Sequence, residues 1–519
     1  KELVRKQERN IQPLSDDYIK FIAFAHWKIK QAGQGIVGMI TNNSYLDGLI
    51  HRDMRKKLLE EFNEVYILNL HGSVKRKDMT PEGKKDENVF DIQQGVSIVL
   101  MVKNEKISKS IKYMDIYGTR EEKYEFLDKD DVYSTDWQEL NPKSPNNFFV
   151  PKNVEGEEKY NKFISLASVF NKNNAGVATG KDHALVDFDK DSLMRKLSIL
   201  NKESFFLLMD NFEVDDSLKE KWFDELKKNP IDEQIKKYSY RPFDNRFVIY
   251  NTKILQRARD GIMKNMLQGN LSLITTKQLS GNNFFHSFIT DSISDRCLIS
   301  LKTREVSYVF PLYLYSDLEQ QNLLNEGAKS ANFNWSMFPS MYQTVQPFTS
   351  KLTGSFIQAE EAIFYYIYAV LYSEIYRGKY QEFLKIDFPR IPFTKEYELF
   401  EALVEKGEQL VNLHLLKSRE LNNPITKFEG KGNGSIQDVK KENNHVYINV
   451  NQYFQISDEA WNYYIGGYQV LEKWLKDRKG IKLSLENIKH YCRMVTSISK
   501  TIEIQKEIDR LYPKVEESL

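Results

Sequence analysis

The segment of residues 240–246 combines two guanidinium groups, aromatic rings and a proline within seven residues. Pro242 fixes its own backbone and favours an extended conformation for Arg241, so the arginines would project from a stiff segment. Asp244 could hold either Arg241 or Arg246 by a bidentate pair. Guanidinium groups match phosphate oxygens and the major-groove edge of guanine, so we predict contact with nucleic acid, with a structural ion pair as the alternative. The predicted contact residues are Tyr240, Arg241, Asp244 and Arg246.

Other polar residues fit the same kind of surface. Glycine permits close backbone approach, lysine meets phosphates, and glutamine and arginine pair with adenine and guanine in the major groove. The alternatives are a plain surface turn and solvated helix faces. The further predicted contacts are Thr179, Lys181 and Asp182 in a turn at Gly180; Lys253, Arg257 and Arg259 on a predicted helix extended by Lys264; Lys277 with Gln278; and Arg304 after Lys302.

Composition bounds the class of protein. A chain of 519 residues predicts two to four domains, and 74 basic against 73 acidic residues leave a formal net charge of +1. Any DNA-binding surface must therefore be a local basic patch. Two distant cysteines and eight histidines without ligand spacing predict neither a disulfide framework nor a metal site. No apolar run approaches the roughly 18 to 20 residues of a membrane span, so we expect a cytoplasmic protein.

The first 120 residues predict half of a doubly wound α/β domain. The expected elements are helices at residues 15–31 and 49–62 and buried parallel strands at residues 35–41, 65–70 and 95–102. Open α/β sheets place their sites at the carboxyl ends of strands. Side chains there could line the pocket for a flipped adenine, the alternative being a hydrogen-bonded turn that caps the next helix. These residues are Asn42, Asn43, Ser44, Tyr45 and His71.

The rest of the chain predicts a mixed region followed by helices. Short β-rich runs are expected at residues 205–208, 247–250, 271–274 and 306–314, and helices at residues 163–170, 359–376, 396–420 and after a cap at Ser484. The aromatic stripe within residues 364–376 has helical spacing and predicts core packing. Gly466 and Gly467 are expected to permit close helix approach within a helical run.

Several segments resemble, in this order, the Type ISP restriction-modification enzymes, relatives of the gamma-class adenine-N6 DNA methyltransferases. They are residues 35–46, 66–72, 88–98, 176–182, 240–246, 310–315, 389–392 and 465–475. The resemblance implies a multidomain α/β and α+β protein: a partial Rossmann-like methyltransferase sheet, a mixed α+β target recognition domain and a helical C-terminal part. The implied domains are 1–120, the C-terminal half of the methyltransferase domain; 121–160, a linker; 161–428, the target recognition domain; 429–445, a flexible linker; and 446–519, the helical C-terminal part.

The chain lacks two motifs of that family. Neither the Phe-x-Gly-x-Gly turn that binds S-adenosylmethionine nor the Asn-Pro-Pro-Tyr motif that holds the extruded adenine occurs. The resemblance therefore implies the C-terminal part of a longer adenine-specific methyltransferase, with no catalytic residue here and no cofactor bound by this chain alone. The intact enzyme would use S-adenosylmethionine, and the partners would be double-stranded DNA and the upstream half of the methyltransferase domain.

Two other functions remain open at this point. The chain could be a stand-alone DNA specificity subunit that recruits a separate methyltransferase or nuclease. It could also be a protein-interaction scaffold that does not bind DNA.

Overall fold

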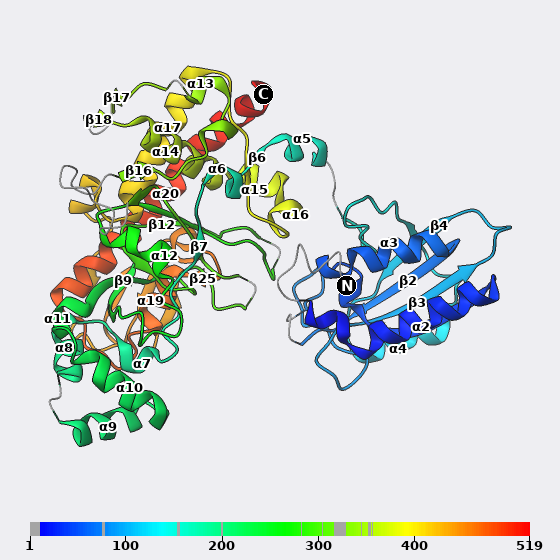
Figure 1. Cartoon of the computed structure of the whole chain (residues 1–519), viewed down its shortest axis with the longest axis horizontal. Helices are drawn as coiled ribbons and strands as arrows, with labels where there is room; N and C mark the ends of the chain where they lie inside the picture. Colours follow the sequence, from blue (N-terminus) through cyan, green and yellow to red (C-terminus); the bar gives the residue numbers. More distant parts are fainter. Residues whose placement is uncertain are drawn as a thin grey trace. The chain divides into compact units, whose positions relative to one another are not determined.

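The structure is a computed structural model, shown in Figure 1. It describes residues 11–74, 78–152, 156–198, 201–281, 283–303, 305–315, 329–343, 345–350, 354 and 356–519. The chain divides into two compact units, Lys1–Val154 and Glu155–Leu519. No helix in the described part of the chain is long and apolar enough to span a membrane.

The first unit is built on a five-stranded sheet with the strand order β1-β3-β2-β4-β5. Strand β3 is antiparallel to both neighbours, whereas β2 and β4 are parallel. Helices α2 and α3 pack on one face and α4 on the other. The bounds are α2 Asp17–Ala32, β1 Gly35–Asn42, α3 Arg52–Glu61, β2 Glu64–His71, β3 Val96–Lys103, β4 Ser110–Asp115, α4 Arg120–Lys129 and β5 Gln138–Glu139.

The predicted strands and helices of this unit are present, but the predicted parallel pairing is wrong. A loop, and not a crossover helix, joins β2 to β3, so β3 enters the sheet antiparallel between β1 and β2. Strand β1 is an edge strand and is not buried on both faces, since Ile36 and Ile40 are 71% and 56% exposed. Residues 121–139, expected as part of a linker, form α4 and β5 of the first unit.

Three four-stranded sheets lie in the described part of the second unit, and the first two have the orders β13-β9-β10-β8 and β12-β11-β14-β7. The expected strands near residues 247–250, 271–274 and 306–314 are confirmed. The bounds are β7 Asn174–Ala175, β8 Val186–Asp187, β9 Ile235–Arg241, β10 Asp244–Ile249, β11 Ser272–Thr275, β12 Ser287–Thr290, β13 Ile293–Ser294, β14 Tyr308–Pro311 and β15 Tyr313–Tyr315.

Short helices precede and follow these strands. The predicted strand at residues 205–208 is wrong, because these residues lie in α9, which Asn201 caps by accepting a hydrogen bond from the Ser204 amide. An apolar run of four residues carries no period that would separate a strand from a helix. The bounds are α5 Glu157–Lys162, α6 Leu166–Val169, α7 Asp182–Leu185, α8 Lys190–Leu197, α9 Lys202–Asp210, α10 Asp216–Leu226, α11 Ile231–Gln234 and α12 Asp260–Met263.

Three long helices build much of the second unit's core. Helices α14 (Ala359–Tyr372), α17 (Tyr397–His414) and α20 (Leu485–Glu517) lie side by side, coloured from yellow-green to red in Figure 1. The predicted aromatic stripe is buried in this core. Gly407 permits close approach, since a Cβ there would lie 1.9 Å from the Tyr365 carbonyl oxygen. The predicted cap is confirmed, because Ser484 accepts a hydrogen bond from the Asn487 amide.

The C-terminal segment differs from the expected linker and helices. Residues 429–445 contribute to a four-stranded sheet formed by β20 (Phe428–Glu429), β21 (Lys440–Glu442), β22 (His445–Tyr447) and β23 (Tyr453–Gln455), and Ile436 is fully buried. The prediction for Gly466 and Gly467 is also wrong. They form the turn of a hairpin between β24 (Tyr464–Ile465) and β25 (Tyr468–Gln469), before α19 (Val470–Lys476).

Candidate nucleic-acid interface

Three arginine guanidinium groups and four aromatic rings alternate in one stack of the second unit. Each guanidinium carbon lies between 3.7 and 5.7 Å from the centroids of its neighbouring rings. Such contacts stabilise cations that are partly removed from water. The order of this arginine–aromatic stack is Tyr468, Arg241, Tyr240, Arg246, Phe188, Arg478 and Trp474.

Three carboxylates pair with the arginines of the stack, and one of them, Asp477 Oδ2, lies 3.5 Å from Arg246 Nη2. Asp244 accepts hydrogen bonds from Arg246 Nη2 at 2.8 Å and from Arg478 Nη2 at 2.6 Å, and Arg241 Nη1 donates to Asp295 Oδ1 at 3.0 Å. Burial raises the pKa of Asp244, but the charges of Arg478 and Arg246 outweigh it and hold the pKa below its ordinary value. The stack is therefore a set of desolvated ion pairs that ties β9 and β10 to α19 and the residues after it.

Arg241 and Arg246 make buried ion pairs, as expected if the segment of residues 240–246 has a structural role. Arg241 is 6% exposed, and its guanidinium also donates to the Tyr240 carbonyl oxygen. The Arg246 side chain is 13% exposed. Contact between these arginines and DNA stays a prediction. Sequence reasoning missed the other members of the stack. The segment at residues 465–475 and Arg478 after it were a usable signal for Tyr468, Trp474 and Arg478, whereas no signal marked Phe188.

Two neighbouring turns bring several predicted contact residues together. Gly180 has a φ of 82°, the Thr179 hydroxyl donates to Asp182, and Asp182 accepts a hydrogen bond from the Tyr240 hydroxyl at 2.9 Å. The second turn pairs with the first, since the Arg257 amide donates to the Ala178 carbonyl at 2.9 Å. We call residues 178–182 and 256–257 the paired turns. They hold the half-buried Lys181 and the exposed Arg257 on one fixed backbone.

The predicted basic helix is wrong. Residues 252–255 are turns, and α12 begins only after Arg259, which has a left-handed φ of 57°. Lys253 and Arg257 are exposed, whereas Arg259 is half-buried, so the three do not form one helix face. A run of polar residues interrupted by apolar ones is compatible with consecutive turns as well as with a helix. Here the backbone of residues 256–257 pairs with residues 178–179, which is incompatible with a helix at these positions.

The remaining predicted contacts lie on loops at the end of the β11 and β12 pair. Lys277 Nζ lies 3.8 Å from Asp387 Oδ1, and both Lys277 and Gln278 are half-exposed. Lys302 is exposed on the loop before β14. Arg304 lies outside the described residues.

In the first unit, the predicted pocket residues form the turn after β1. Asn42 caps this turn, because its Oδ1 accepts a hydrogen bond from the Ser44 amide at 2.9 Å. Asn43 is buried and donates to Asn69 Oδ1 at 3.0 Å, and Tyr45 packs in the core against Phe149. These contacts match the turn that was the alternative expectation, and Ser44 is half-exposed. A role in an adenine pocket stays a prediction.

His71 lies at the same carboxyl edge of the sheet in a fixed orientation. Its φ is 48°, its Nε2 lies 2.5 Å from Asp115 Oδ1, and its ring stacks on Tyr117 with centroids 4.1 Å apart. Asp115 ends β4, which runs parallel to β2, so the two strands deliver these groups to one edge. Sequence reasoning missed Asp115 and Tyr117, although their place at the end of a strand was a usable signal.

Arg55 was also missed, and it fixes the turn after β1. It is fully buried, and its guanidinium donates to the carbonyl oxygens of Tyr45 at 2.6 Å, Gly48 at 2.8 Å and Asn147 at 2.9 Å. Burial lowers the pKa of Arg55 to about 10. No local pattern marks an arginine whose partners are backbone carbonyls in distant segments.

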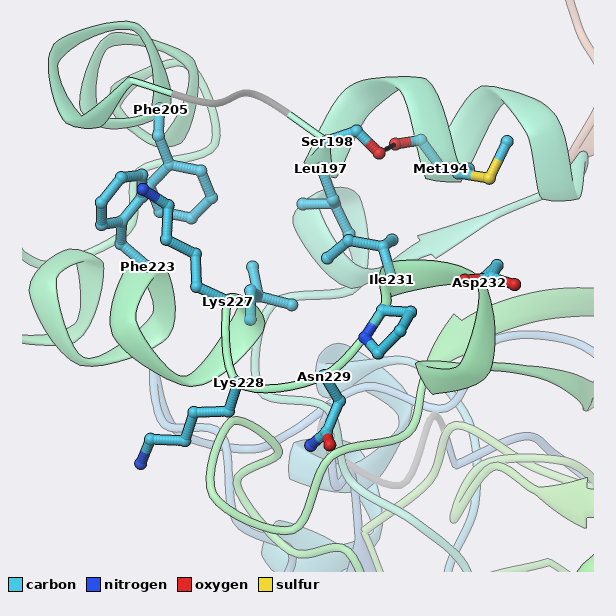
Figure 2. A pocket seen from close by; sticks show the side chains of 12 residues that line it. Met194, Leu197, Ser198, Phe205, Phe223, Lys227, Lys228, Asn229, Ile231 and Asp232 are labelled. Carbon is cyan, nitrogen blue, oxygen red and sulfur yellow. Dashed lines mark hydrogen bonds between the residues drawn. The ribbon is translucent and has the colours of Figure 1, made fainter.

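A pocket of about 470 Å³ lies among α8, α9, α10 and α11 (Figure 2). Its wall is mostly apolar, with Leu197, Phe205 and Phe223, and the Lys227 ammonium lies 4.0 Å from the centroid of the Phe223 ring. None of the predicted contact residues lines this pocket. The candidate interface is therefore the paired turns and the loops described above.

Comparisons with known proteins agree with the fold. Three solved structures are similar: the ATP-dependent Type ISP restriction-modification enzyme LlaBIII bound to DNA, a nuclease-deletion mutant of the Type ISP enzyme LlaGI with a DNA substrate mimic, and a DrdV–DNA complex. In that order the identities are 23%, 21% and 20%, the TM-scores are 0.70, 0.69 and 0.70, and the matches cover 96%, 97% and 95% of this chain.

This chain spans only 34%, 48% and 52% of the length of those three chains. A search of curated proteins gives no match. The family model described as the Type ISP C-terminal specificity domain matches residues 168–507, which is most of the chain. The resemblance and the mixed multidomain fold inferred from the sequence are confirmed, and the protein belongs to the Type ISP restriction-modification family through this specificity domain.

Proposed function

We propose that this chain recognises a specific sequence in double-stranded DNA for a restriction-modification enzyme. The observation that carries the proposal is the specificity-domain match over residues 168–507, within which the paired turns hold Lys181 and Arg257 on one rigid backbone. A lysine and an arginine fixed in this way suit phosphate and base-edge contacts. The arginine–aromatic stack holds the paired turns in place, because Tyr240 belongs to the stack and its hydroxyl donates a hydrogen bond to Asp182 in the first turn.

The test is a selection of duplexes from a random library by the purified 519-residue chain at near-physiological salt. An enriched motif supports the proposal, and the Lys181→Ala/Arg257→Ala variant should lose affinity for it with a smaller salt dependence. Lys190→Ala, which removes an exposed lysine at the start of α8, is the matched control and should bind normally. A wild-type chain that selects no sequence contradicts the proposal.

The proposed reaction of the intact enzyme is methylation of adenine N6 with S-adenosylmethionine, whose binding motif this chain lacks. The partner would be the rest of a methyltransferase sheet. Support comes from β1, since in the described part of the chain no strand pairs with its outer edge. An unpaired edge is a template for another strand. Exposed apolar side chains flank this edge on both faces of the sheet: Ile36 and Ile40 of β1 lie on the face opposite α2, and Phe21, Phe24 and Trp27 lie on α2 itself.

Reading the coding sequence upstream of Lys1 tests this part. An in-frame Asn-Pro-Pro-Tyr motif supports one polypeptide that carries both halves. A start codon there supports the alternative, a stand-alone specificity subunit that recruits a separate catalytic chain. The Ile36→Asp/Ile40→Asp variant should weaken the packing of the first unit against the catalytic half, whether that half belongs to the same polypeptide or to a separate chain. DNA binding by the second unit should be unchanged.

A further inference from the structure

Two neighbouring loops and a third segment that is distant from them in the sequence meet beside the β12-β11-β14-β7 sheet. They are residues 276–281 and 283–286 between β11 and β12, residues 299–303 and 305–307 before β14, and the hairpin turn between β24 and β25. The Gly466 amide donates to the Phe285 carbonyl oxygen at 2.7 Å, and the Gly467 amide donates to the Ile299 carbonyl oxygen at 2.8 Å. We call these three segments the loop tip.

A buried carboxylate fixes the loop tip. Glu305 is fully buried. Its Oε1 accepts a hydrogen bond from the Ser280 amide at 2.8 Å, and its Oε2 accepts one from the Ser300 hydroxyl at 2.6 Å and lies 3.0 Å from His286 Nε2. Burial raises the pKa of Glu305, but the hydrogen bonds from His286 and Ser300 lower it to about 2. A fully hydrogen-bonded buried carboxylate makes the surrounding loops rigid.

The rigid loops hold apolar surface in solvent. Leu301 is 63% exposed, next to the exposed Lys302. Phe285 stacks on Tyr464 with ring centroids 6.1 Å apart, and Tyr464 is 41% exposed. A single exposed leucine is common, but here a buried ionic network fixes the loop that presents it. Gln278 and Lys277, which are predicted DNA contacts, lie on the neighbouring loop.

We propose that Leu301 contacts a thymine methyl group in the major groove of duplex DNA. The methyl group of thymine is the apolar feature of the major-groove edges, so it is the group that an exposed leucine on a DNA-reading loop would recognise. Lys302 Nζ lies 3.6 Å from Glu305 Oε1 and Lys277 Nζ lies 3.8 Å from Asp387 Oδ1, but their side chains are 56% and 40% exposed, so both ammonium groups can also contact the flanking phosphates. Because Glu305 fixes the loop before binding, less conformational entropy is lost on contact. The inference rests on the proposed DNA recognition and names one reader of the sequence.

The experiment uses the full chain and the duplex enriched from the random library, with each thymine replaced in turn by deoxyuridine, which lacks the methyl group. The wild type should lose affinity at one thymine by about fourfold, the change expected for burying one methyl group. Leu301→Ala should bind the thymine duplex less tightly and should not respond to deoxyuridine at that position. Leu207→Ala, which truncates a leucine on α9 that is 69% exposed, should behave like the wild type.

Glu305→Gln supplies an independent readout of the positioning role. Below its melting temperature this variant should keep salt-dependent binding to random duplex but lose the response to deoxyuridine. Wild-type affinity in Leu301→Ala, or an unchanged response to deoxyuridine in that variant, overturns the inference alone. Failure of the wild-type chain to enrich any sequence overturns both the inference and the proposed function, so the two failures are distinguishable.

Discussion

Arg478 and Asp244 are 234 residues apart in the sequence, yet Arg478 Nη2 lies 2.6 Å from Asp244 Oδ1 in the interior of the second unit. Both side chains are almost fully buried, and Asp244 also accepts two hydrogen bonds from Arg246. The pair joins the β9–β10 hairpin to the C-terminal segment. The C-terminal residues therefore belong to the same folded unit as the predicted contact residues.

Asp244→Asn should destabilise the second unit by roughly 3–5 kcal/mol, because the buried Arg478 loses the carboxylate that it contacts at 2.6 Å and Arg246 keeps only the more distant Asp477 at 3.5 Å. Chemical denaturation measures the effect. Lys440→Ala is the control, since Lys440 and Glu442 form an exposed ion pair, and it should leave the midpoint unchanged. An unaltered midpoint for Asp244→Asn would show that the pair does not contribute to stability.

Arg241→Ala and Lys181→Ala should fail in different ways. Arg241 is buried against Asp295, so its loss should lower the melting temperature and reduce DNA binding only through unfolding. Lys181 is half-exposed and its ammonium group donates an exposed hydrogen bond to the Glu213 carbonyl oxygen, so its loss should change melting little and reduce the slope of log affinity against log salt by about one. Paired melting curves and salt titrations separate the two. A folded Arg241→Ala protein with altered base preference would instead make Arg241 a direct reader.

Stability should depend on pH through Glu305. Its pKa is lowered from 4.5 to about 2 in the folded protein, so its contribution is complete above about pH 4.5 and is lost as the pH falls toward 2. The contribution is on the order of 3 kcal/mol. The free energy of unfolding should therefore fall less steeply in Glu305→Gln than in the wild type below about pH 5. Equal pH dependence of the unfolding free energy in the two proteins would mean that the fold does not lower the pKa of Glu305.

Gly466→Ala should destabilise the β24–β25 hairpin, whose turn is part of the loop tip. Gly466 has a φ of 60°, and a Cβ there would lie 1.8 Å from the Ile299 carbonyl oxygen. The cost should exceed about 1 kcal/mol, measured by thermal or chemical unfolding. Gly261→Ala in α12 is the matched control, because a Cβ there meets no atom within 4 Å, and it should be neutral or slightly stabilising. Equal stability of both variants would refute the packing argument.

The sequence predicted those elements whose signals are local. Ser484 was identified as a cap because the cap and its partner are three residues apart, and β1, β2 and β3 were predicted from short apolar runs, whereas β4 and β5 were not predicted. The pairing of β3 between β1 and β2 depends on the path of a long loop and was not predictable. The strand predicted at residues 205–208 was wrong because a short apolar run without a clear period does not distinguish a strand from a helix.

The candidate site was predictable only in part. The cluster at residues 240–246 was found, but its burial depends on Asp295 and Arg478, which no spacing rule connects to it. His71 was identified at a strand end, whereas its partner Asp115 comes from a strand 44 residues later. Contacts of this kind form through tertiary packing, so a single sequence marks one partner without marking the other.

Selection from a random duplex library by the purified chain tests the central claim most directly. The account predicts an enriched motif at near-physiological salt, which the wild type and the Lys190→Ala control bind equally and the Lys181→Ala/Arg257→Ala variant binds weakly. Recovery of duplexes without a shared sequence, or equal binding of that motif by the double variant, would contradict sequence recognition through the paired turns.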